Sequence, residues 1–367
     1  MRKSRKRGEI LKKQYVIPIF VPHLGCPNDC IFCNQKSISG KIKTPTEEEL
    51  RETIDMFLNN FKEEDSYKEI AFFGGSFTGI EVELQEKFLK VANEYIKNKK
   101  VDSIRISTRP DYINKDILKM LKKYNVKTIE LGVQSTNDYI LKIAKRGHTF
   151  EDVKKASKLI RRYRFKLGHQ MMLGLPDSTK TDEIATAKAL IKLKPKMMRI
   201  YPVLVIKNTM LAKYYEEGKY EPLTLNQAVE RSKELIYLFN KKKINVIRVG
   251  LQNTDTITDP NSNESEVIAG PYHPAFRQLV ESSIWYDTIV KKIKEFNVKV
   301  KEASVEVNPI DVNNAIGHKK ENIEKFKEIY DVKVKVIANE NIKQGKIKVN
   351  IVKTYSDFLD DEKVSLR

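Results

Sequence analysis

Hydrophobic and polar positions follow two alternating periods along the chain. Short runs rich in β-branched and aromatic residues, typical of buried strands, are separated by longer stretches with apolar residues every three or four positions, as in amphipathic helices. The predicted strands cover residues 15–21, 69–73, 103–107, 128–133, 165–173 and 197–204, with a further one at 245–251. The predicted helices cover residues 46–60, 81–97, 115–124, 136–145, 151–163, 181–193 and 225–240.

This regular alternation predicts an α/β fold with a parallel sheet and right-handed crossovers. About six strand–helix units suit an open, partial βα barrel better than a closed eight-stranded one. The pattern changes near residue 285, where a lysine-rich stretch with helices and short strands predicts a small α+β module. We therefore expect a basic N-terminal tail over residues 1–13, the barrel domain with its extension over 14–284, and the module over 285–367.

Polar residues and glycines fall directly after five of the predicted strands. In parallel α/β folds the carboxyl ends of the strands form the edge at which binding sites are built. Five such segments in succession predict the rim of one pocket. They are residues 26–33, 74–78, 107–111, 132–135 and 173–179.

The chain has three cysteines, all in the first of these segments: Cys26, Cys30 and Cys33, spaced C-x3-C-x2-C. Three thiolates can hold three irons of a 4Fe–4S cluster and leave the fourth iron open to a small molecule. Two other interpretations remain. His23 could complete a Cys3His structural zinc site, or the cysteines could be buried free thiols.

Composition and charge narrow the class of protein. With 40% hydrophobic and 32% charged residues, and no apolar run as long as a membrane span, the chain has the composition of a soluble protein. No secretory leader or disulfide framework is visible, so we expect a cytoplasmic protein.

Lys and Arg number 68 against 49 Asp and Glu, a net charge of +19. This excess favours a polyanionic partner, nucleic acid or an anionic membrane surface, although lysine-rich solvated helix faces would also explain it.

The cysteine spacing, with aromatic Phe32 before Cys33, resembles that of the radical S-adenosylmethionine (SAM) enzymes. The phrases STRPDY, IELGVQS, RGHT, HQMMLGLP and RIYPVLVIKNT, spread over residues 15–250, resemble the branch that contains the catalytic subunit of Elongator. The resemblance implies a 4Fe–4S cluster that cleaves SAM to a 5′-deoxyadenosyl radical, and an electron donor such as ferredoxin or flavodoxin. It also implies a transferase that modifies carbon 5 of the wobble uridine of tRNA. Residues 285–367 do not resemble the acetyltransferase domain of Elongator, so we expect a short form without it.

The resemblance also implies roles for single residues. Gly74 and Gly75, with Ser76, would hold the amino group of SAM, although Gly-Gly is also a common tight turn. Arg109 would bind the carboxylate of SAM, unless it pairs with Asp111. The other candidates are Thr108, Gln134 and Leu175 around SAM, His148 and His169 as proton-transfer groups, and Lys207 as an active-site cation. Histidines are more often structural, and the chain has many surface lysines.

Two further function classes remain open. A radical SAM enzyme with a small-molecule substrate, as in the coproporphyrinogen dehydrogenase branch, would share the GVQS phrase. A zinc-bound RNA-binding protein would need no catalysis.

Residues 305–336 read as strand, short helix, turn, helix and strand. With Gly317-His318-Lys319-Lys320 at the turn, they resemble a KH RNA-binding domain. Lys320 stands where the GXXG loop of that domain has its second glycine. A basic packing module without RNA binding would have the same pattern. The segment around His273 resembles shorter relatives of Elongator.

Overall fold

The computed structural model describes residues 13–21, 30–34, 44–63, 65–254 and 256–355. Contacts divide the chain into two compact units. The first comprises the chain up to Thr224 together with Leu238–Tyr272, and the second comprises Leu225–Tyr237 and the chain from His273 onward. No helix in these ranges combines the length and apolar character needed to cross a membrane.

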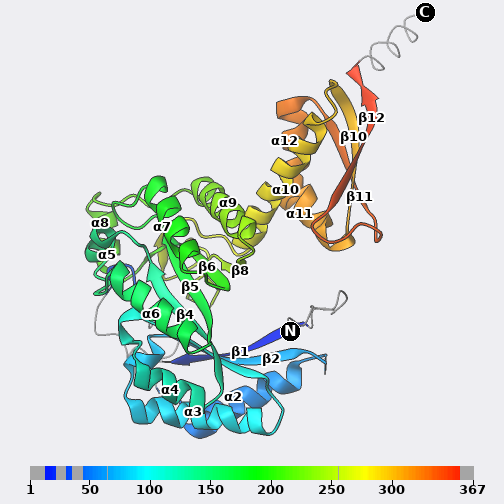
Figure 1. Cartoon of the computed structure of the whole chain (residues 1–367). Helices are drawn as coiled ribbons and strands as arrows, with labels where there is room; N and C mark the ends of the chain where they lie inside the picture. The colour runs from blue at the N-terminus through cyan, green and yellow to red at the C-terminus, as the bar shows by residue number, and fades with distance from the viewer. Residues whose placement is uncertain (1–12, 22–29, 35–43, 64, 255, 356–367) are drawn as a thin grey trace, which may run out of the picture. The chain divides into compact units, whose positions relative to one another are not determined.

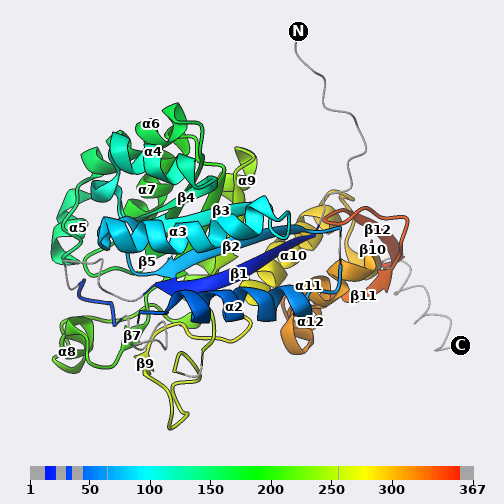
Figure 2. The ribbon, with the colours of Figure 1, turned by 90° about the horizontal axis from the view of Figure 1, so that it is seen from below.

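The first unit is built on a seven-stranded parallel sheet with the order β1-β2-β3-β4-β5-β6-β8. The sheet curls into a half-barrel with helices around it (Figures 1 and 2). This confirms the predicted open βα barrel, and the strand expected at 245–251 is the seventh strand of the sheet. The strands are β1 (Gln14–Val21), β2 (Tyr67–Gly74), β3 (Ser103–Thr108), β4 (Val126–Gln134), β5 (Lys166–Leu173), β6 (Met197–Pro202) and β8 (Asn245–Val249).

Most helices begin where the sequence places a hydroxyl or amide side chain that caps them. Thr46 forms the expected capping box with Glu49, and Thr149 and Thr179 form equivalent boxes at later helices. Each box satisfies backbone N–H groups that have no partner inside the helix. The helices are α2 (Glu47–Asn60), α3 (Val82–Lys97), α4 (Lys115–Lys123), α5 (Asp138–Ile143), α6 (Phe150–Arg162), α7 (Lys180–Lys192), α8 (Met210–Glu216) and α9 (Leu225–Lys241).

Short elements complete the first unit and lie in the connections between the main ones. Two 3-10 turns, Phe77–Gly79 and Pro110–Tyr112, follow β2 and β3 directly. Two short strands, β7 (Val205–Ile206) and β9 (Val267–Ala269), pair antiparallel. The pair brings part of the segment that follows β8, which has loop composition, back to the chain after β6.

The second unit is a three-stranded sheet with helices on one face. The strand order is β11-β10-β12, with β10 parallel to β11 and antiparallel to β12. Apolar side chains of the helices and of the sheet, among them Ile289, Val305 and Phe326, form one buried cluster. The elements are the first part of α9, over Leu225–Tyr237, and α10 (Phe276–Lys294), β10 (Val300–Val307), α11 (Val312–Ile316), α12 (Glu321–Tyr330), β11 (Lys333–Ala338) and β12 (Ile347–Thr354), with 3-10 turns at Pro309–Asp311 and His318–Lys320.

Candidate functional site

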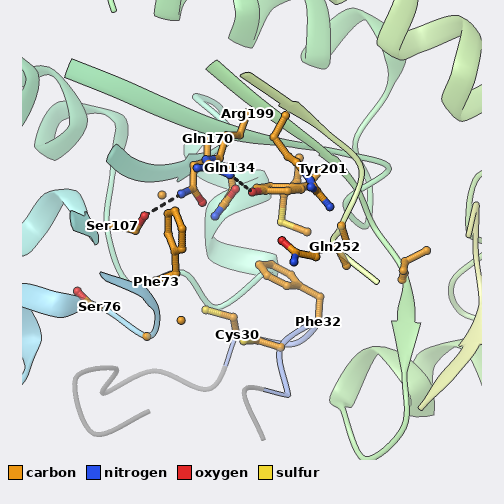
Figure 3. Close-up of a pocket in the computed structure, with 18 of the residues that line it drawn as sticks. Cys30, Phe32, Phe73, Ser76, Ser107, Gln134, Gln170, Arg199, Tyr201 and Gln252 are labelled. Atoms are coloured by element: carbon orange, nitrogen blue, oxygen red, sulfur yellow. Dashed lines mark hydrogen bonds between the residues drawn. The ribbon is translucent and has the colours of Figure 1, made fainter. Parts of the chain in front are cut away.

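A cavity of about 270 Å³ lies at the carboxyl ends of the strands of the first unit. Because all seven strands are parallel, segments far apart in the sequence meet at this edge. Side chains from several strands point toward the cavity, and Cys30 and Phe32 lie on its opposite side (Figure 3). The predicted residues that line it are Cys30, Cys33, Gly74, Gly75, Ser76, Thr108, Arg109 and Gln134.

The cysteine segment is fixed to the cavity wall by its backbone. The N–H of Cys33 donates to the carbonyl of Cys30 at 2.9 Å, so the two thiols belong to one tight turn. Between them, Ile31 is buried, donates to the carbonyl of Ala144 at 3.3 Å and accepts from the N–H of Leu211 at 2.8 Å. Two thiols are thus held at the cavity. Cys26 and His23 lie outside the described residues.

Arg146, which sequence reasoning did not single out, connects this turn to the sheet. Its Nη1 donates to the sulfur of Cys30 at 3.2 Å, and its Nη2 donates to the carbonyl of Gly132 at 2.7 Å. A guanidinium at this distance compensates the negative charge of a sulfur that acts as a thiolate ligand. The arginine belongs to the RGHT phrase, so its place in a recognised motif was the available signal.

Gly74 ends β2 in a conformation that glycine tolerates best. Its φ is +98°, and a Cβ there would lie 2.6 Å from the carbonyl oxygen of Val21. The next residue, Gly75, donates its N–H to the same carbonyl at 3.2 Å. The chain therefore passes close to β1, and a bare backbone faces the cavity.

The hydroxyls that follow β2 and β3 bind one another. The Thr108 hydroxyl lies 2.8 Å from that of Ser76 and 2.6 Å from that of Thr78. The backbone N–H of Arg109 donates to the Ser76 hydroxyl at 3.2 Å. The side chain of Arg109 forms a two-point ion pair with Asp111, at 3.0 and 2.8 Å, as the alternative interpretation of this residue expected. These contacts fix the shape of the cavity wall.

Gln134 presents a polar atom to the cavity. It ends β4 with φ of +69°, next to a register shift between β4 and β5. Its side chain is 8% exposed, and Oε1 has no hydrogen-bond partner among the described residues. A buried amide oxygen without a partner is costly in a folded protein. It is therefore suited to accept a hydrogen bond from a bound molecule.

The two predicted histidines are buried and lie behind the cavity wall rather than in it. Nε2 of His169 lies 2.9 Å from the hydroxyl of Ser157, and burial lowers the pKa of this histidine to about 3. Nε2 of His148 lies 3.3 Å from the carbonyl of Val133. Burial, with the nearby guanidiniums, lowers the pKa of His148 to about 4. Both imidazoles are therefore neutral near pH 7.

Lys207 and Leu175 lie outside the set of residues that line the cavity. Lys207 is exposed, and its Nζ donates to the carbonyl of Ser265 at 2.7 Å. Leu175 is buried in an apolar cluster that also contains Cys30 and Phe32. It therefore supports the cysteine turn from behind.

A network of buried charged side chains crosses the inner face of the sheet. Arg105 donates to Glu69 at 2.8 Å through Nε and to Glu130 through Nη1, and Arg199 donates to Glu130 at 2.5 Å. Burial would raise the pKa of Glu130, but the two guanidiniums hold it below its usual value. Burial would likewise lower the pKa of Arg199, and Tyr201 and Glu130 raise it above its ordinary value. The network is thus ionised, with Arg199 and Tyr201 at the cavity.

Sequence reasoning missed the polar cavity residues of β5 and β6, which are Gln170, Arg199 and Tyr201. Polar side chains at alternate positions of otherwise apolar strands were the available signal, because such positions share one face of a sheet. In an open barrel that face is the interior.

Two sequence profiles match consecutive parts of the chain. A profile described as Radical SAM superfamily matches residues 20–190, and one described as Radical_SAM C-terminal domain matches residues 195–286. An uncharacterized protein of Methanocaldococcus jannaschii is 32% identical over 239 residues, which are 60% of this chain and 72% of that protein.

Other relatives are longer proteins. The chain is 30% identical to the tRNA uridine(34) acetyltransferase of Methanocaldococcus infernus and 26% identical to human Elongator complex protein 3, each over 44% of this chain. It spans about a third of the length of each, 34% and 33%. The solved structure of archaeal Elp3 from M. infernus has the same fold, with a TM-score of 0.59 at 23% identity, over 77% of this chain and 64% of that one.

Proposed function

Because this chain belongs to the radical SAM superfamily, we propose that it modifies transfer RNA with a 4Fe–4S cluster and SAM as cofactors. The observation that carries the proposal is the convergence on one cavity of two cysteines, a bare Gly-Gly backbone and the Gln134 oxygen, which has no hydrogen-bond partner in the part of the chain that the structure describes. When bound, the cluster supplies the electron that cleaves SAM into methionine and a 5′-deoxyadenosyl radical.

The donor set fits the cluster. Cys30 and Cys33 lie in one turn at the cavity, and Cys26, four residues before Cys30, would provide the third thiolate. The guanidinium of Arg146 at the Cys30 sulfur offsets part of the negative charge that several thiolates bring together. Ile31 and Leu175 exclude water from the rear of the turn because both are buried.

The cavity wall fits SAM. A ligand amino group can approach the backbone at Gly74 and Gly75, where no side chain intervenes. Gln134 Oε1 can accept a hydrogen bond from an N–H donor of the ligand. Ser76 and Thr108 position this wall through their shared hydrogen bond. Arg109 lies at the same wall, where its two-point pair with Asp111 fixes the position of the guanidinium.

Three observations support transfer RNA as the substrate. Two of the relatives described above bear names of tRNA uridine modification or of Elongator. The first unit holds 48 Lys and Arg residues against 32 Asp and Glu, so most of the +19 charge belongs to the unit with the cavity. Arg199 and Tyr201 supply a cation and a phenol at the cavity, which suit a polar, anionic substrate. The wobble uridine is the position that we propose.

The test is an anaerobic preparation with the cluster reconstituted. Iron and sulfide analysis should give about four of each per chain. The electron-paramagnetic spectrum of the reduced protein should change when SAM is added, and 5′-deoxyadenosine should form. Cys33→Ala should lose the cluster and all three signals. Incubation with unmodified tRNA, followed by mass spectrometry of nucleosides, should show a new modified uridine.

Each outcome bears on a separate part of the proposal. A colourless protein with one zinc per chain would refute the cluster and support the zinc interpretation. Release of 5′-deoxyadenosine that tRNA never stimulates, with no modified nucleoside, would refute the RNA substrate and leave the cofactors in place. A modified nucleoside at another position would refute the wobble uridine alone.

A further inference from the structure

The second unit contains a turn whose conformation is unusual for its sequence. Gly317-His318-Lys319-Lys320 joins α11 to α12 between the parallel strands β10 and β11. Gly317 has φ of +84°, and Lys319 and Lys320 have φ of +49° and +67°. The left-handed region costs a residue with a side chain roughly 1–2 kcal/mol, so two consecutive lysines there are unfavourable for folding alone. Both lysines are exposed.

The turn leads into a helix start that no side chain caps. Lys320 occupies the N-cap position of α12 and makes no capping hydrogen bond. The first N–H groups of a helix have no acceptor within the helix, and the helix dipole attracts an anion there. Two lysines and these N–H groups therefore offer a binding place for a phosphate. Glu321, the carboxylate nearest in sequence, is paired with Lys325 at 2.5 Å.

An independent observation indicates a ligand beside this turn. A cavity of about 400 Å³, within the same unit, has His273, His318, Ser282 and Asn322 among its lining residues, together with Lys325 and the carboxylates Glu230 and Glu321. Ser282 is 4% exposed, and its hydroxyl has no hydrogen-bond partner among the residues that the structure describes. A buried hydroxyl that stays unpaired next to a cavity is suited to a bound polar group. The imidazole rings of His273 and His318 lie edge to face, 5.3 Å apart, and offer flat surfaces against which a base can stack.

Asn322 holds the turn and the cavity in one arrangement. Its buried Nδ2 donates to the carbonyls of Ser282, Asn314 and Ala315 at 3.0, 3.3 and 3.1 Å. A Cβ on Gly317 would lie 2.9 Å from the Asn322 backbone nitrogen, so the turn packs directly on α12. The same side chain thus ties the backbone of α10 at Ser282 to that of α11, which leads into the turn.

We propose that the turn at 317–320 and the adjoining cavity bind RNA, with a backbone phosphate on Lys319 and Lys320 and a neighbouring nucleoside in the cavity. This deepens the proposed function, on which it rests, by assigning the second unit a contact with the transfer RNA. The second unit holds 20 basic and 17 acidic residues, so its net charge alone attracts RNA weakly. The turn therefore acts as a local clamp, while the charge of the first unit provides the general attraction.

The test measures the affinity of the full-length chain for RNA at several salt concentrations. Probes are fluorescently labelled bulk tRNA and a labelled single-stranded RNA of twelve nucleotides. The variant is Lys319→Asp with Lys320→Asp, because aspartate tolerates positive φ better than lysine and reverses the charge. The control is Lys343→Asp with Lys346→Asp, which changes the charge equally at exposed positions between β11 and β12.

The turn variant should weaken binding of both probes about tenfold or more and reduce the salt dependence by about one to two phosphate contacts. The control should stay within about twofold, and thermal unfolding should show both variants folded. Ser282→Ala should weaken binding about two- to fivefold without loss of stability, since it removes a hydroxyl that has no hydrogen-bond partner among the described residues. The proposal would be refuted if the turn variant and its control lost RNA affinity equally. It would also be refuted if the turn variant bound RNA as tightly as the wild type.

The same variants separate this inference from the proposed function. 5′-Deoxyadenosine formation from SAM without RNA should be the same in the turn variant and the wild type. If the wild type modifies tRNA and the turn variant does so with an unchanged KM for tRNA, the inference fails and the proposed function stands. If no RNA is modified but the turn variant loses RNA affinity, the proposed function fails and the RNA site stands.

Discussion

Replacing Glu130 by Gln tests how far the buried charges of the barrel support the fold. The substitution keeps the shape of the side chain and removes its negative charge. Glu130 is 1% exposed and accepts hydrogen bonds from Arg105 and, at 2.5 and 3.2 Å, from Arg199. Arg105 retains Glu69 as a partner, at 2.8 Å through Nε. Arg199 keeps the Tyr201 hydroxyl, at 3.4 Å, and the ring of Phe73, whose centroid lies 4.9 Å from the guanidinium, but no carboxylate among the described residues.

The expected loss of stability comes from the charge of Arg199, which Glu130→Gln leaves without a carboxylate partner. Removing one member of a buried ion pair costs about 3–5 kcal/mol, because the remaining charge stays in a medium that solvates it poorly. Glu130 pairs with the guanidiniums of Arg105 and Arg199, but in the variant Arg105 would still be paired with Glu69. We therefore expect Glu130→Gln to lower the free energy of unfolding by about 3–4 kcal/mol. Adding Arg199→Met removes the unpaired cation and should restore at least about half of that loss.

The measurement is chemical unfolding followed by circular dichroism at pH 7. The control Glu151→Gln removes an exposed carboxylate that pairs with Lys154 at 2.5 Å, and should leave the free energy of unfolding close to that of the wild type. A Glu130→Gln variant within about 1 kcal/mol of the wild type would refute the reasoning. The same holds if the double variant is less stable than Glu130→Gln, since the unpaired cation would then not be the cause.

Two further substitutions test backbone geometry and protonation. Gly74→Ala should cost about 2 kcal/mol or more, because it combines a φ of +98° with a Cβ 2.6 Å from the Val21 oxygen. The control is Gly218→Ala, where φ is +68° but an added Cβ would meet no non-neighbouring residue within 4 Å, and the free energy of unfolding should fall by about 1 kcal/mol. Equal losses of stability at both glycines would contradict the role of the close approach at Gly74. The lowered pKa of His169, about 3, means that the unfolded chain binds the proton better. Stability should therefore fall as pH drops from about 6.5 toward 3, by up to about 1.4 kcal/mol per pH unit, and His169→Gln should reduce this slope when both proteins are unfolded by urea at a series of pH values.

The sheet could be predicted because its signals are local. Each strand is a short apolar run, and each capping box, such as Thr46 with Glu49, marks where a helix starts. The positions of Gly74 and Cys30 just after strands then predict which edge of the sheet carries the site. These inferences need only the order of elements and the geometry of parallel strands.

The charged interior of the barrel could not be predicted in the same way. Glu130 and Arg199 are 69 residues apart, and which face of each strand turns inward depends on the direction in which the sheet curls. The contact of Arg146 with the Cys30 sulfur spans 116 residues for the same reason. Sequence spacing describes neighbours on one element, whereas these pairs are neighbours only after the sheet has closed.

The sequence by itself determined the elements, the open βα barrel and the residues that could bring cluster and SAM chemistry to its rim. It also offered Lys207, His148 and His169 as candidate active-site groups, and only the tertiary structure decided that these lie outside the cavity lining while Arg199 and Tyr201 lie within it. The physical reason is that secondary structure follows from local periodicity and capping, but burial and orientation are set by packing across the whole sheet.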